Sequence, residues 1–273
     1  MAGICVPKDV PDKWSATCAA RAAQLNPRNV ELDTGPDPHR IAVLKSKYHG
    51  RDQRVLTVSF LETTNRATRT KILAYANEWN CGISFEFTTG VGDIRISRGR
   101  GGYWSYLGTD VLSIPRGRQT MNLAGFTERT SDAEYARVVC HEFGHTLGFP
   151  HEHMRGQVQQ RLDRQATYEH FRRYSGWSRA TVDSQIFAPM SEGIAGTDTD
   201  EASIMAYHFP GSITKNGEPI LGGDDINDND RQFARLMYPV DEVIEPEEPE
   251  PEPVEPLPEG PEWDDNFTAI NWV

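Results

Sequence analysis

The sequence predicts a globular domain that contains both β-strands and α-helices. Runs of β-branched and aromatic residues with alternating polarity occur at 55–60, 83–89 and 92–97 and indicate strands. Apolar residues at helical spacing, with capping residues in front of them, occur at 65–80 and 131–147. The chain contains no run of 18 apolar residues, so we expect no membrane-spanning helix and no membrane partner.

Three segments of different composition make up the 273 residues. Residues 1–53 contain scattered prolines and room for one short helix near Ala16–Leu25, so we expect an N-terminal extension. Residues 54–240 carry the strand and helix patterns and form the expected compact domain. Residues 241–273 are dominated by glutamate and proline, a composition that cannot bury an apolar core and that predicts an extended tail.

The first half of the compact domain is predicted to begin with strand 55–60 and a helix that ends near Asn80. Asn65 is placed to cap this helix, because a short polar side chain can accept a hydrogen bond from the first free N–H groups. The apolar stripe of the helix consists of Ile72, Leu73, Ala76 and Trp79. Two strands, a glycine-rich turn and a third strand are then expected at 83–89, 92–97, 98–102 and 120–125.

The second half is predicted to be mainly helical. A long helix spans about Ser131–Leu147 and ends at Gly148, since glycine readily adopts the positive φ of a helix C-terminus. A further helix is expected near Ala166–Tyr174. Asn227, with Asp230 three residues later, is typical of a helix N-terminus. The surrounding acidic run lacks the glycine and final glutamate of an EF-hand loop, so we interpret these residues as caps rather than calcium ligands.

The net charge of −12 belongs to the C-terminal tail. Twelve of the 40 acidic residues lie between Asp241 and Asp265, and no Lys or Arg follows Arg235, so the remainder of the chain is close to neutral. Without a basic patch, nothing predicts a nucleic-acid partner. The tail ends in the aromatic-rich segment 262–273, which is either a free end or a short motif that docks a partner.

The N-terminus and the cysteines leave the cellular compartment open. No basic segment followed by an apolar segment is present at the start of the chain, so we expect no standard signal peptide. Export by another route and intracellular residence are both consistent with this. The four cysteines, Cys5, Cys18, Cys81 and Cys140, are too few for a disulfide-based scaffold at this length.

The segment HEFGHTLGFPHEH, which begins at His141, contains the spacing H-E-x-x-H-x-x-G-x-x-H. His141 and His145 are four residues apart, so on a helix of about 3.6 residues per turn both imidazoles project toward the same side. Gly148 lets the chain turn back and Pro150 prevents the helix from resuming, which allows His151 to approach as a third ligand. The spacing therefore predicts a site for one zinc ion held by three histidine nitrogens.

Three protein ligands leave the fourth position of a tetrahedral zinc ion open, which distinguishes a catalytic site from a structural one. Glu142 lies about 100° around the helix from the first ligand, close enough to accept a proton from zinc-activated water and pass it to a leaving amine. Ordinary surface histidines would not explain all five motif positions at these offsets. The opposite helix face carries Ala136, Cys140, Phe143 and Leu147, so we expect Cys140 to be a core thiol rather than a ligand.

With this elongated motif, residues 54–239 resemble the metzincin clan of zinc metallopeptidases, and within it the astacin family and its matrixin-like microbial relatives. The resemblance implies an α+β fold with a twisted mixed sheet, an active-site helix, a Met-turn and a C-terminal helix. It also implies hydrolysis of peptide bonds in proteins, with one zinc ion per chain. Residues 54–240 would then be the catalytic domain and residues 1–53 a possible pro-segment.

The segment SIMAYHF at 203–209 is similar to the Met-turn of this clan. The resemblance places Met205 beneath the zinc site. It also assigns to Tyr207 the role of an astacin tyrosine that stabilises the tetrahedral intermediate. A phenol O–H can do this by donating a hydrogen bond to the developing oxyanion.

The segment GRGGYWSYLG at 99–108 is similar to the astacin region that leads into an edge strand. In metzincins this antiparallel edge strand binds extended peptides by main-chain hydrogen bonds. Our candidates for substrate binding are therefore Trp104, Ser105, Tyr106, Leu107 and Gly108. The aromatic side chains in this segment are equally consistent with packing in the core.

Two positions bear on maturation. Glu152 follows the third ligand, as in astacins, where that glutamate pairs with the N-terminus of the mature enzyme; here such a pairing would require cleavage. The cysteine positions do not match the usual astacin disulfides, and the aspartate latency motif of astacin pro-segments is missing. Cys5 is either an ordinary free or disulfide-bonded cysteine, or a latency switch whose thiolate occupies the open zinc position.

Three functions are consistent with these residues. The first, which we expect, is an active endopeptidase that acts on peptide or protein substrates. The second is a zinc-containing peptide-binding module without catalysis, which would have no need to keep both Glu142 and Tyr207. The third is a hydrolase of a non-protein amide such as a cell-wall peptide, which the sequence does not separate from proteolysis.

Overall fold

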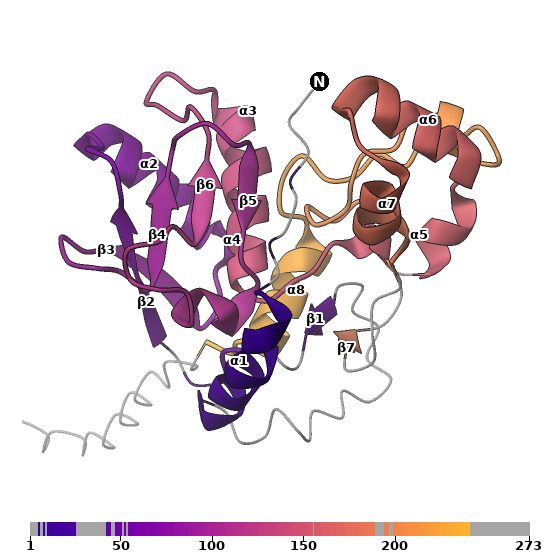
Figure 1. The fold of residues 1–273 in the computed structure, drawn as a ribbon. Coiled ribbons are helices and arrows are strands. Elements are labelled where there is room, and N and C mark those ends of the chain that lie inside the picture. The colour runs from indigo at the N-terminus through magenta and orange to yellow at the C-terminus, as the bar shows by residue number, and fades with distance from the viewer. Residues whose placement is uncertain are drawn as a thin grey trace, which may run out of the picture. The chain divides into compact units, whose positions relative to one another are not determined.

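A computed structural model describes Cys5, Lys8, Asp52 and residues 10–25, 42–44, 47–50, 54–154, 156–188, 194–196 and 199–240 (Figure 1). All of them belong to the unit Met1–Asp241. The tail predicted at 241–273 lies outside the described residues. None of the helices in the described part of the chain is both long and apolar enough to span a membrane.

The central sheet has five strands in the order β3-β2-β4-β6-β5. Their bounds are Arg54–Phe60 for β2, Ile83–Phe87 for β3, Ile94–Ser97 for β4, Tyr103–Ser105 for β5 and Met121–Leu123 for β6. Strands β3, β2, β4 and β6 run parallel to their neighbours, whereas β5 pairs antiparallel with β6 and forms one edge. The predicted mixed sheet and the α+β fold class are confirmed.

Two helical segments share one large apolar core with the sheet. They are α2 (Arg66–Ala76), with its 3₁₀ turn Asn77–Trp79, and the continuous segment formed by α3 (Asp132–Glu134), the π-helical turn η5 (Tyr135–Cys140) and α4 (His141–Thr146). Asn65 caps α2 as predicted, since its side chain accepts a hydrogen bond from Thr68 N at 2.8 Å. The Phe85 ring of the sheet meets Phe143 of α4 edge-on, with centroids 4.6 Å apart. This packing fixes α4 against the sheet.

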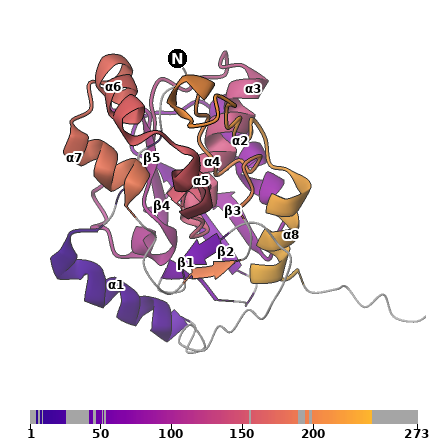
Figure 2. The same cartoon turned by 90° about the vertical axis from the view of Figure 1, so that its right-hand side faces the viewer.

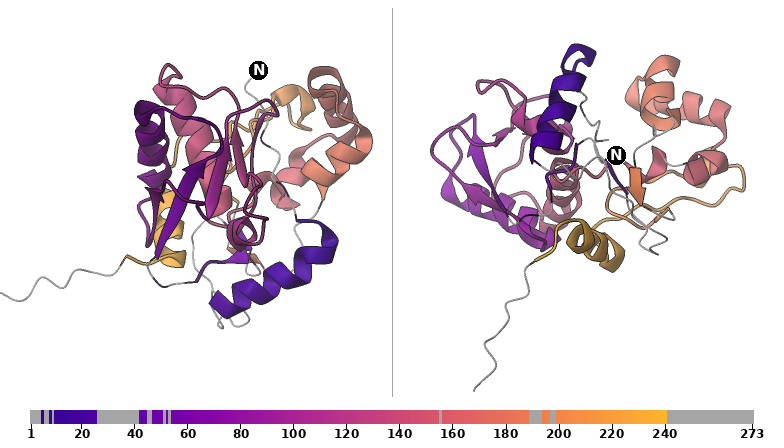
Figure 3. Two further views of the ribbon diagram at one scale, coloured as in Figure 1. Left: turned by 60° about the vertical axis from the view of Figure 1, so that its left-hand side comes forward. Right: turned by 90° about the horizontal axis from the view of Figure 1, so that it is seen from below.

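The second half of the domain is a helical lobe, visible in Figures 1 and 3 on the side away from β3. It contains the 3₁₀ turn η6 (Glu152–Met154), α5 (Gly156–Arg161), α6 (Arg164–Ser175), α7 (Arg179–Val182), the π-helical turn η7 (Asp183–Phe187) and the 3₁₀ turn η8 (Gly211–Ile213). A separate apolar cluster forms its interior and includes Phe171, Ile186, Tyr207 and Phe209. Helix α6 was predicted, whereas α5 and α7 were not.

The last helix, α8 (Asp228–Met237), begins with the predicted cap. The Asn227 side chain accepts from Asp230 N, and the Asp230 side chain accepts from Asn227 N, which together form a capping box.

After α8, Tyr238 packs on Tyr48 with ring centroids 5.1 Å apart. His49 is also fully buried, with Nε2 2.9 Å from Thr146 O. The core of the domain thus includes residues that precede position 54.

Helix α1 (Asp12–Leu25) starts four residues before the helix expected at Ala16–Leu25. It contacts the 3₁₀ turn η4 (Gly108–Leu112), and Cys18 packs in a small cluster with Val10 and Ile114. The short strands β1 (Ala42–Leu44) and β7 (Ile194–Gly196) form an antiparallel pair. Figure 2 shows α1 and this pair from a second side.

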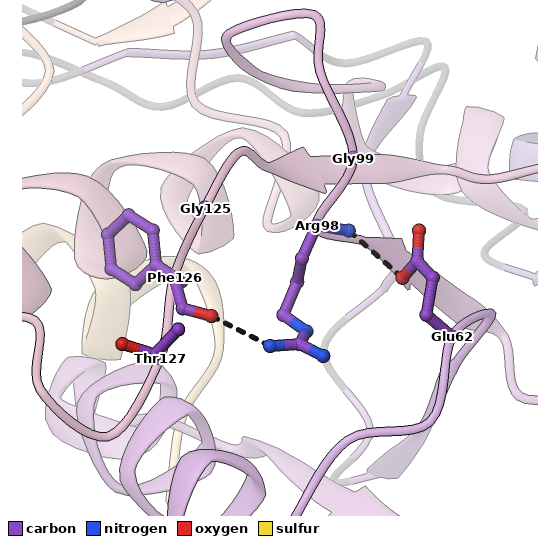
Figure 4. Close-up of a pocket in the computed structure, with 6 residues that line it drawn as sticks. All are labelled: Glu62, Arg98, Gly99, Gly125, Phe126 and Thr127. Atoms are coloured by element: carbon purple, nitrogen blue, oxygen red, sulfur yellow. Dashed lines mark hydrogen bonds between the residues drawn. The ribbon is translucent and has the colours of Figure 1, made fainter.

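Arg98 connects the segments that follow β2, β4 and β6, around a cavity of about 190 Å³ (Figure 4). Its backbone N–H donates to Glu62 Oε2 at 3.0 Å, and its guanidinium donates to Phe126 O at 2.8 Å and Thr63 O at 3.0 Å. The cavity is lined by Glu62, Arg98, Gly99, Gly125, Phe126 and Thr127. None of these residues belongs to the predicted zinc motif.

Candidate active site

A continuous helical segment presents the first two histidines of the motif. Ser131 caps its start, with Oγ accepting from Glu134 N at 3.2 Å. The segment continues to Thr146 and ends at Gly148, which has a φ of 93° and donates its N–H to His145 O at 2.8 Å. The helix ends at the predicted glycine because that residue adopts a positive φ without steric cost.

Three imidazoles converge on one point. His141 and His145 project from α4, and His151 returns toward them after the turn. The Nε2 atom of His151 lies 3.0 Å from that of His141 and 3.1 Å from that of His145. Zinc with Zn–N distances of about 2.0–2.1 Å separates tetrahedral ligands by about 3.3 Å, so a small adjustment accommodates one ion.

Backbone carbonyls determine which nitrogen of two of these rings faces this point. His141 Nδ1 lies 2.7 Å from Ile204 O, and His145 Nδ1 lies 2.8 Å from Phe149 O. Because a carbonyl only accepts, each Nδ1 carries the hydrogen and each Nε2 presents a lone pair. Lone pairs this close repel one another unless a cation lies between them. The donor set therefore fits zinc.

Burial keeps these rings neutral. The pKa of His141 is lowered to about 4, mainly because its charged form loses hydration. Burial also lowers the pKa of His145 and of His151 well below the ordinary histidine value, and the neighbouring histidines add to the effect. Neutral imidazole is the form that binds zinc, so the site is ready for metal at neutral pH.

Glu142 is buried beside the histidines, with 1% of its surface exposed. Neither carboxylate oxygen has a hydrogen-bond partner of ordinary geometry among the described residues. Burial raises the pKa of this carboxyl to about 8. A buried carboxylate is unfavourable unless a cation, a proton or water completes its surroundings. Its position fits a group that exchanges a proton next to the metal site.

Cys5 completes the cluster. Its Sγ and one nitrogen from each of the three histidines all lie within 4.8 Å of one another. Burial and the neighbouring Glu142 carboxylate raise the pKa of its thiol, whereas a coordinated metal acts in the opposite direction and removes the proton. Of the two interpretations that the sequence leaves open for Cys5, this position favours a fourth zinc ligand.

A tight turn around Met205 packs against the ligand helix. Ala206 N donates to Ser203 O at 3.0 Å and closes the turn. Met205 is fully buried, and a Cβ atom placed on Gly144 would lie only 2.5 Å from its Sδ. The turn and α4 are therefore in direct contact, at a position where only glycine fits without displacement.

Asp230 holds this turn in shape. Its carboxylate accepts from Ser203 Oγ at 2.6 Å and from Ile204 N at 3.0 Å. Since Ile204 O is the acceptor for His141 Nδ1, Asp230 supports the orientation of a zinc ligand through one intervening residue. The sequence predicted Asp230 only as a helix cap, because the contact with the turn spans 26 residues and has no local signal.

Comparisons with known proteins address the family. No protein-family model matches the sequence, and no curated protein matches it. A structure of myroilysin is 35% identical, with a TM-score of 0.68, and the match covers 73% of this chain and 98% of that chain. This identity over nearly the whole of myroilysin decides the family.

The chain belongs to the astacin-like metzincin family.

Two other structures match less well. A crystal structure of myroilysin is 34% identical, covering 69% of this chain and 85% of that one, with a TM-score of 0.53. High choriolytic enzyme 1, a hatching enzyme zinc-protease from the medaka fish Oryzias latipes, is 19% identical and covers 67% of this chain and 88% of that one, with a TM-score of 0.46. As the motif predicted, this astacin-like chain is a zinc metalloendopeptidase, and its three histidines cluster in a way that fits a zinc-binding site.

In this astacin-like enzyme, the segment expected to bind substrate lies at the end of the edge strand. Trp104 and Ser105 belong to β5, and Tyr106 forms an isolated parallel bridge with Lys8. Leu107 and Gly108 do not continue the strand, since Gly108 has a φ of 48° and begins η4. The Trp104 side chain is buried, with Lys8 Nζ 3.5 Å from its ring centre.

Tyr207 lies beside the third histidine. Its ring centroid is 4.3 Å from that of His151. Its hydroxyl is buried and has no hydrogen-bond partner among the described residues. Burial raises the pKa of this phenol well above its ordinary value, so the hydroxyl stays protonated and can donate a hydrogen bond.

Glu152 is fully buried and connects the ligand segment to the turn around Met205. Its N–H donates to Met205 O at 3.0 Å, and its carboxylate accepts from Asp200 N at 3.3 Å. Pairing of Glu152 with a mature N-terminus stays a prediction.

His153, which no motif singled out, is fully buried in the same region. The exposed His208 does not join the cluster.

Proposed function

We propose that this enzyme cleaves peptide bonds in protein substrates with Glu142 as the general base and Tyr207 as the donor to the oxyanion. The observation that supports this most strongly is the convergence of three neutral imidazoles beside the buried carboxylate of Glu142. When bound, zinc supplies Lewis-acid polarisation of the scissile carbonyl and lowers the pKa of a water molecule to about 7.

The chain's own groups have separate tasks in this proposal. The Glu142 carboxylate accepts a proton from the attacking water and delivers it to the leaving nitrogen. The Tyr207 hydroxyl donates to the carbonyl oxygen as negative charge develops on it. The outer edge of β5 pairs with the extended substrate through main-chain hydrogen bonds.

We also propose that the N-terminal segment keeps the enzyme latent. Cys5 supplies the thiol in the metal cluster, and Lys8 N donates to Ser105 O at 3.0 Å. Helix α1 then packs near Ile114 and Tyr106, beyond the end of β5. A substrate strand on β5 needs the same edge, so the segment and the substrate exclude each other. Activation requires that this segment leave or be cut.

Zinc content and peptide cleavage test the catalytic assignment. We would measure both for the Cys5→Ser protein, which removes the blocking thiol, and for the same protein with Glu142→Ala or the isosteric Glu142→Gln. We expect one zinc per chain in all three and a loss of cleavage by about 10²–10⁴-fold in both Glu142 variants. Undiminished cleavage in those variants would contradict the role of Glu142. Zinc without cleavage in the Cys5→Ser protein, even after limited proteolysis has removed the N-terminal segment from the edge of β5, would favour a peptide-binding module.

A further inference from the structure

His153 is a buried histidine that the proposed chemistry does not use. It lies two positions after the third ligand, in η6, and has 0% of its surface exposed. Its Nε2 lies 3.0 Å from Gln185 O, so this nitrogen carries the hydrogen, because a carbonyl only accepts. Its Nδ1 has no hydrogen-bond partner among the described residues. The ring therefore makes one hydrogen bond, through Nε2, and Nδ1 makes none to the described residues.

The imidazole of His153 is stacked on Tyr207. The ring centroids are 4.1 Å apart and the planes differ by 29°. His153 also stacks on His151, at 4.8 Å and 28°, and meets Phe209 edge-on at 5.4 Å. Aromatic rings at these separations attract one another with a preferred geometry. Contacts from three rings and the bond to Gln185 thus hold the imidazole in one orientation.

Tyr207 depends on this contact for its own orientation. Its hydroxyl has no partner among the described residues, so no hydrogen bond to them directs the phenol. The plane of the Tyr207 ring is inclined by 55° to the ring of His151 and by 55° to the ring of Phe209. The nearly parallel stack on His153 is therefore the contact that defines the plane of the phenol ring.

We infer that His153 is a positioning residue for Tyr207: its ring stacks on the phenol and holds it so that the hydroxyl reaches the substrate oxygen. This inference rests on the proposed role of Tyr207. Gln185 belongs to η7 of the helical lobe, whose apolar cluster also contains Tyr207 and Phe209. His153 thereby connects the packing of that lobe to the geometry of the catalytic hydroxyl. A displacement of about 1 Å at a reacting group can cost about 100-fold in rate.

Two substitutions separate the ring of His153 from its hydrogen bond. His153→Phe keeps a ring that stacks on Tyr207 but loses the donor to Gln185 O. His153→Gln keeps a donor but has no ring. In the Cys5→Ser protein we expect His153→Gln to lower kcat about tenfold or more, and His153→Phe to retain most of it, while KM and zinc content change little. His170, which packs against Tyr174 at 4.8 Å in α6, is the matched control, and His170→Gln should leave kcat unchanged.

A double-substitution cycle shows whether the effect passes through the Tyr207 hydroxyl. If it does, His153→Gln lowers kcat in the parent but adds no further loss to Tyr207→Phe, because the hydroxyl is already absent. A full additional loss in the Tyr207→Phe background would overturn the inference and leave the role of Tyr207 intact. Parental kcat in Tyr207→Phe itself would overturn both.

The orientation of the phenol can also be observed without catalysis. In protein with isotope-labelled tyrosine, the ring resonances of Tyr207 are identified by their loss in Tyr207→Phe. We expect the stacked imidazole to displace them, His153→Phe to keep them displaced, and His153→Gln to move them toward the positions of unstacked tyrosine. Resonances that stay in place in a folded His153→Gln protein would contradict the inference.

Discussion

Cys5 has 7% of its surface exposed, and its Sγ and three imidazole nitrogens all lie within 4.8 Å of one another. Thiolate is a good zinc ligand, and it would occupy the position that catalysis needs for water. Glu142 lies next to it, and each of the two groups affects the pKa of the other. In the proposed latent form, this one side chain would block access to both the metal and the base.

This placement makes Cys5→Ser an activating substitution. We expect the full-length Cys5→Ser variant to cleave peptides faster than the wild type, by about tenfold or more. The rate should rise in proportion to the fraction of molecules whose fourth zinc position is open. Cleavage of a fluorogenic peptide by the two zinc-loaded proteins measures this. Cys81→Ser is the matched control, because Cys81 is a half-buried thiol outside the cluster. Equal activity of wild type and Cys5→Ser would rule out latency through Cys5.

Single residues of the site were predictable where their signals are local. His141, Glu142, His145 and His151 fall within eleven positions, so helix geometry and the turn at Gly148 together predict that they meet. Asp230 and His153 act through contacts with residues far along the chain, at Ile204 and Gln185. No spacing rule reports such contacts, and they emerge only from the folded structure.

The contact between α4 and the turn around Met205 depends on one small residue. Gly144 lies in mid-helix, where glycine is less stable than alanine by about 1 kcal/mol. A Cβ at this position would lie 2.5 Å from Met205 Sδ and 2.7 Å from Trp79 Cζ2. Trp79 is itself fixed by its N–H bond to Cys140 O at 2.9 Å, so it cannot move aside freely. The glycine is required by packing rather than by its φ.

Gly144→Ala should therefore destabilise the protein although alanine favours a helix. Overpacking of a filled core costs about 1–3 kcal/mol, which exceeds or cancels the gain in helix propensity. We expect a lower midpoint in thermal unfolding and weaker zinc retention, because the turn also carries the acceptor for His141. Gly117→Ala is the control, since a Cβ there meets nothing within 4 Å. A Gly144→Ala protein as stable as Gly117→Ala would contradict this account of the contact.

Helices with capping residues at their ends were predicted well. Asn65, Gly148 and Asn227 mark helix boundaries because each satisfies or relieves groups at a helix end, and each does so in the structure. The π-helical turn Tyr135–Cys140 was not predicted, since no residue pattern distinguishes it from regular helix. Helix α7 has four residues, too few to show a period.

For the molecule as a whole, the order of the strands could not be predicted from the sequence patterns. Strand β4 pairs in parallel with β6, with Ile96 opposite Met121, and such pairings join segments that are distant in the chain. The resemblance to metzincins supplied the mixed sheet instead. The burial of Tyr48 and His49 was also not predicted, because the prolines before them indicate an irregular extension. Their contacts with Met237 and Thr146 join this part of the chain to the catalytic body.

The zinc ligands of the intact protein are the most direct test of this account. X-ray absorption at the zinc edge, with metal analysis, should show one zinc per chain with three imidazole nitrogens at about 2.0–2.1 Å and one sulfur at about 2.3 Å. In Cys5→Ser the sulfur should disappear while the three nitrogens remain. A protein without zinc, or zinc whose ligands do not include the imidazole nitrogens, would contradict the claim that His141, His145 and His151 form a metal centre closed by Cys5.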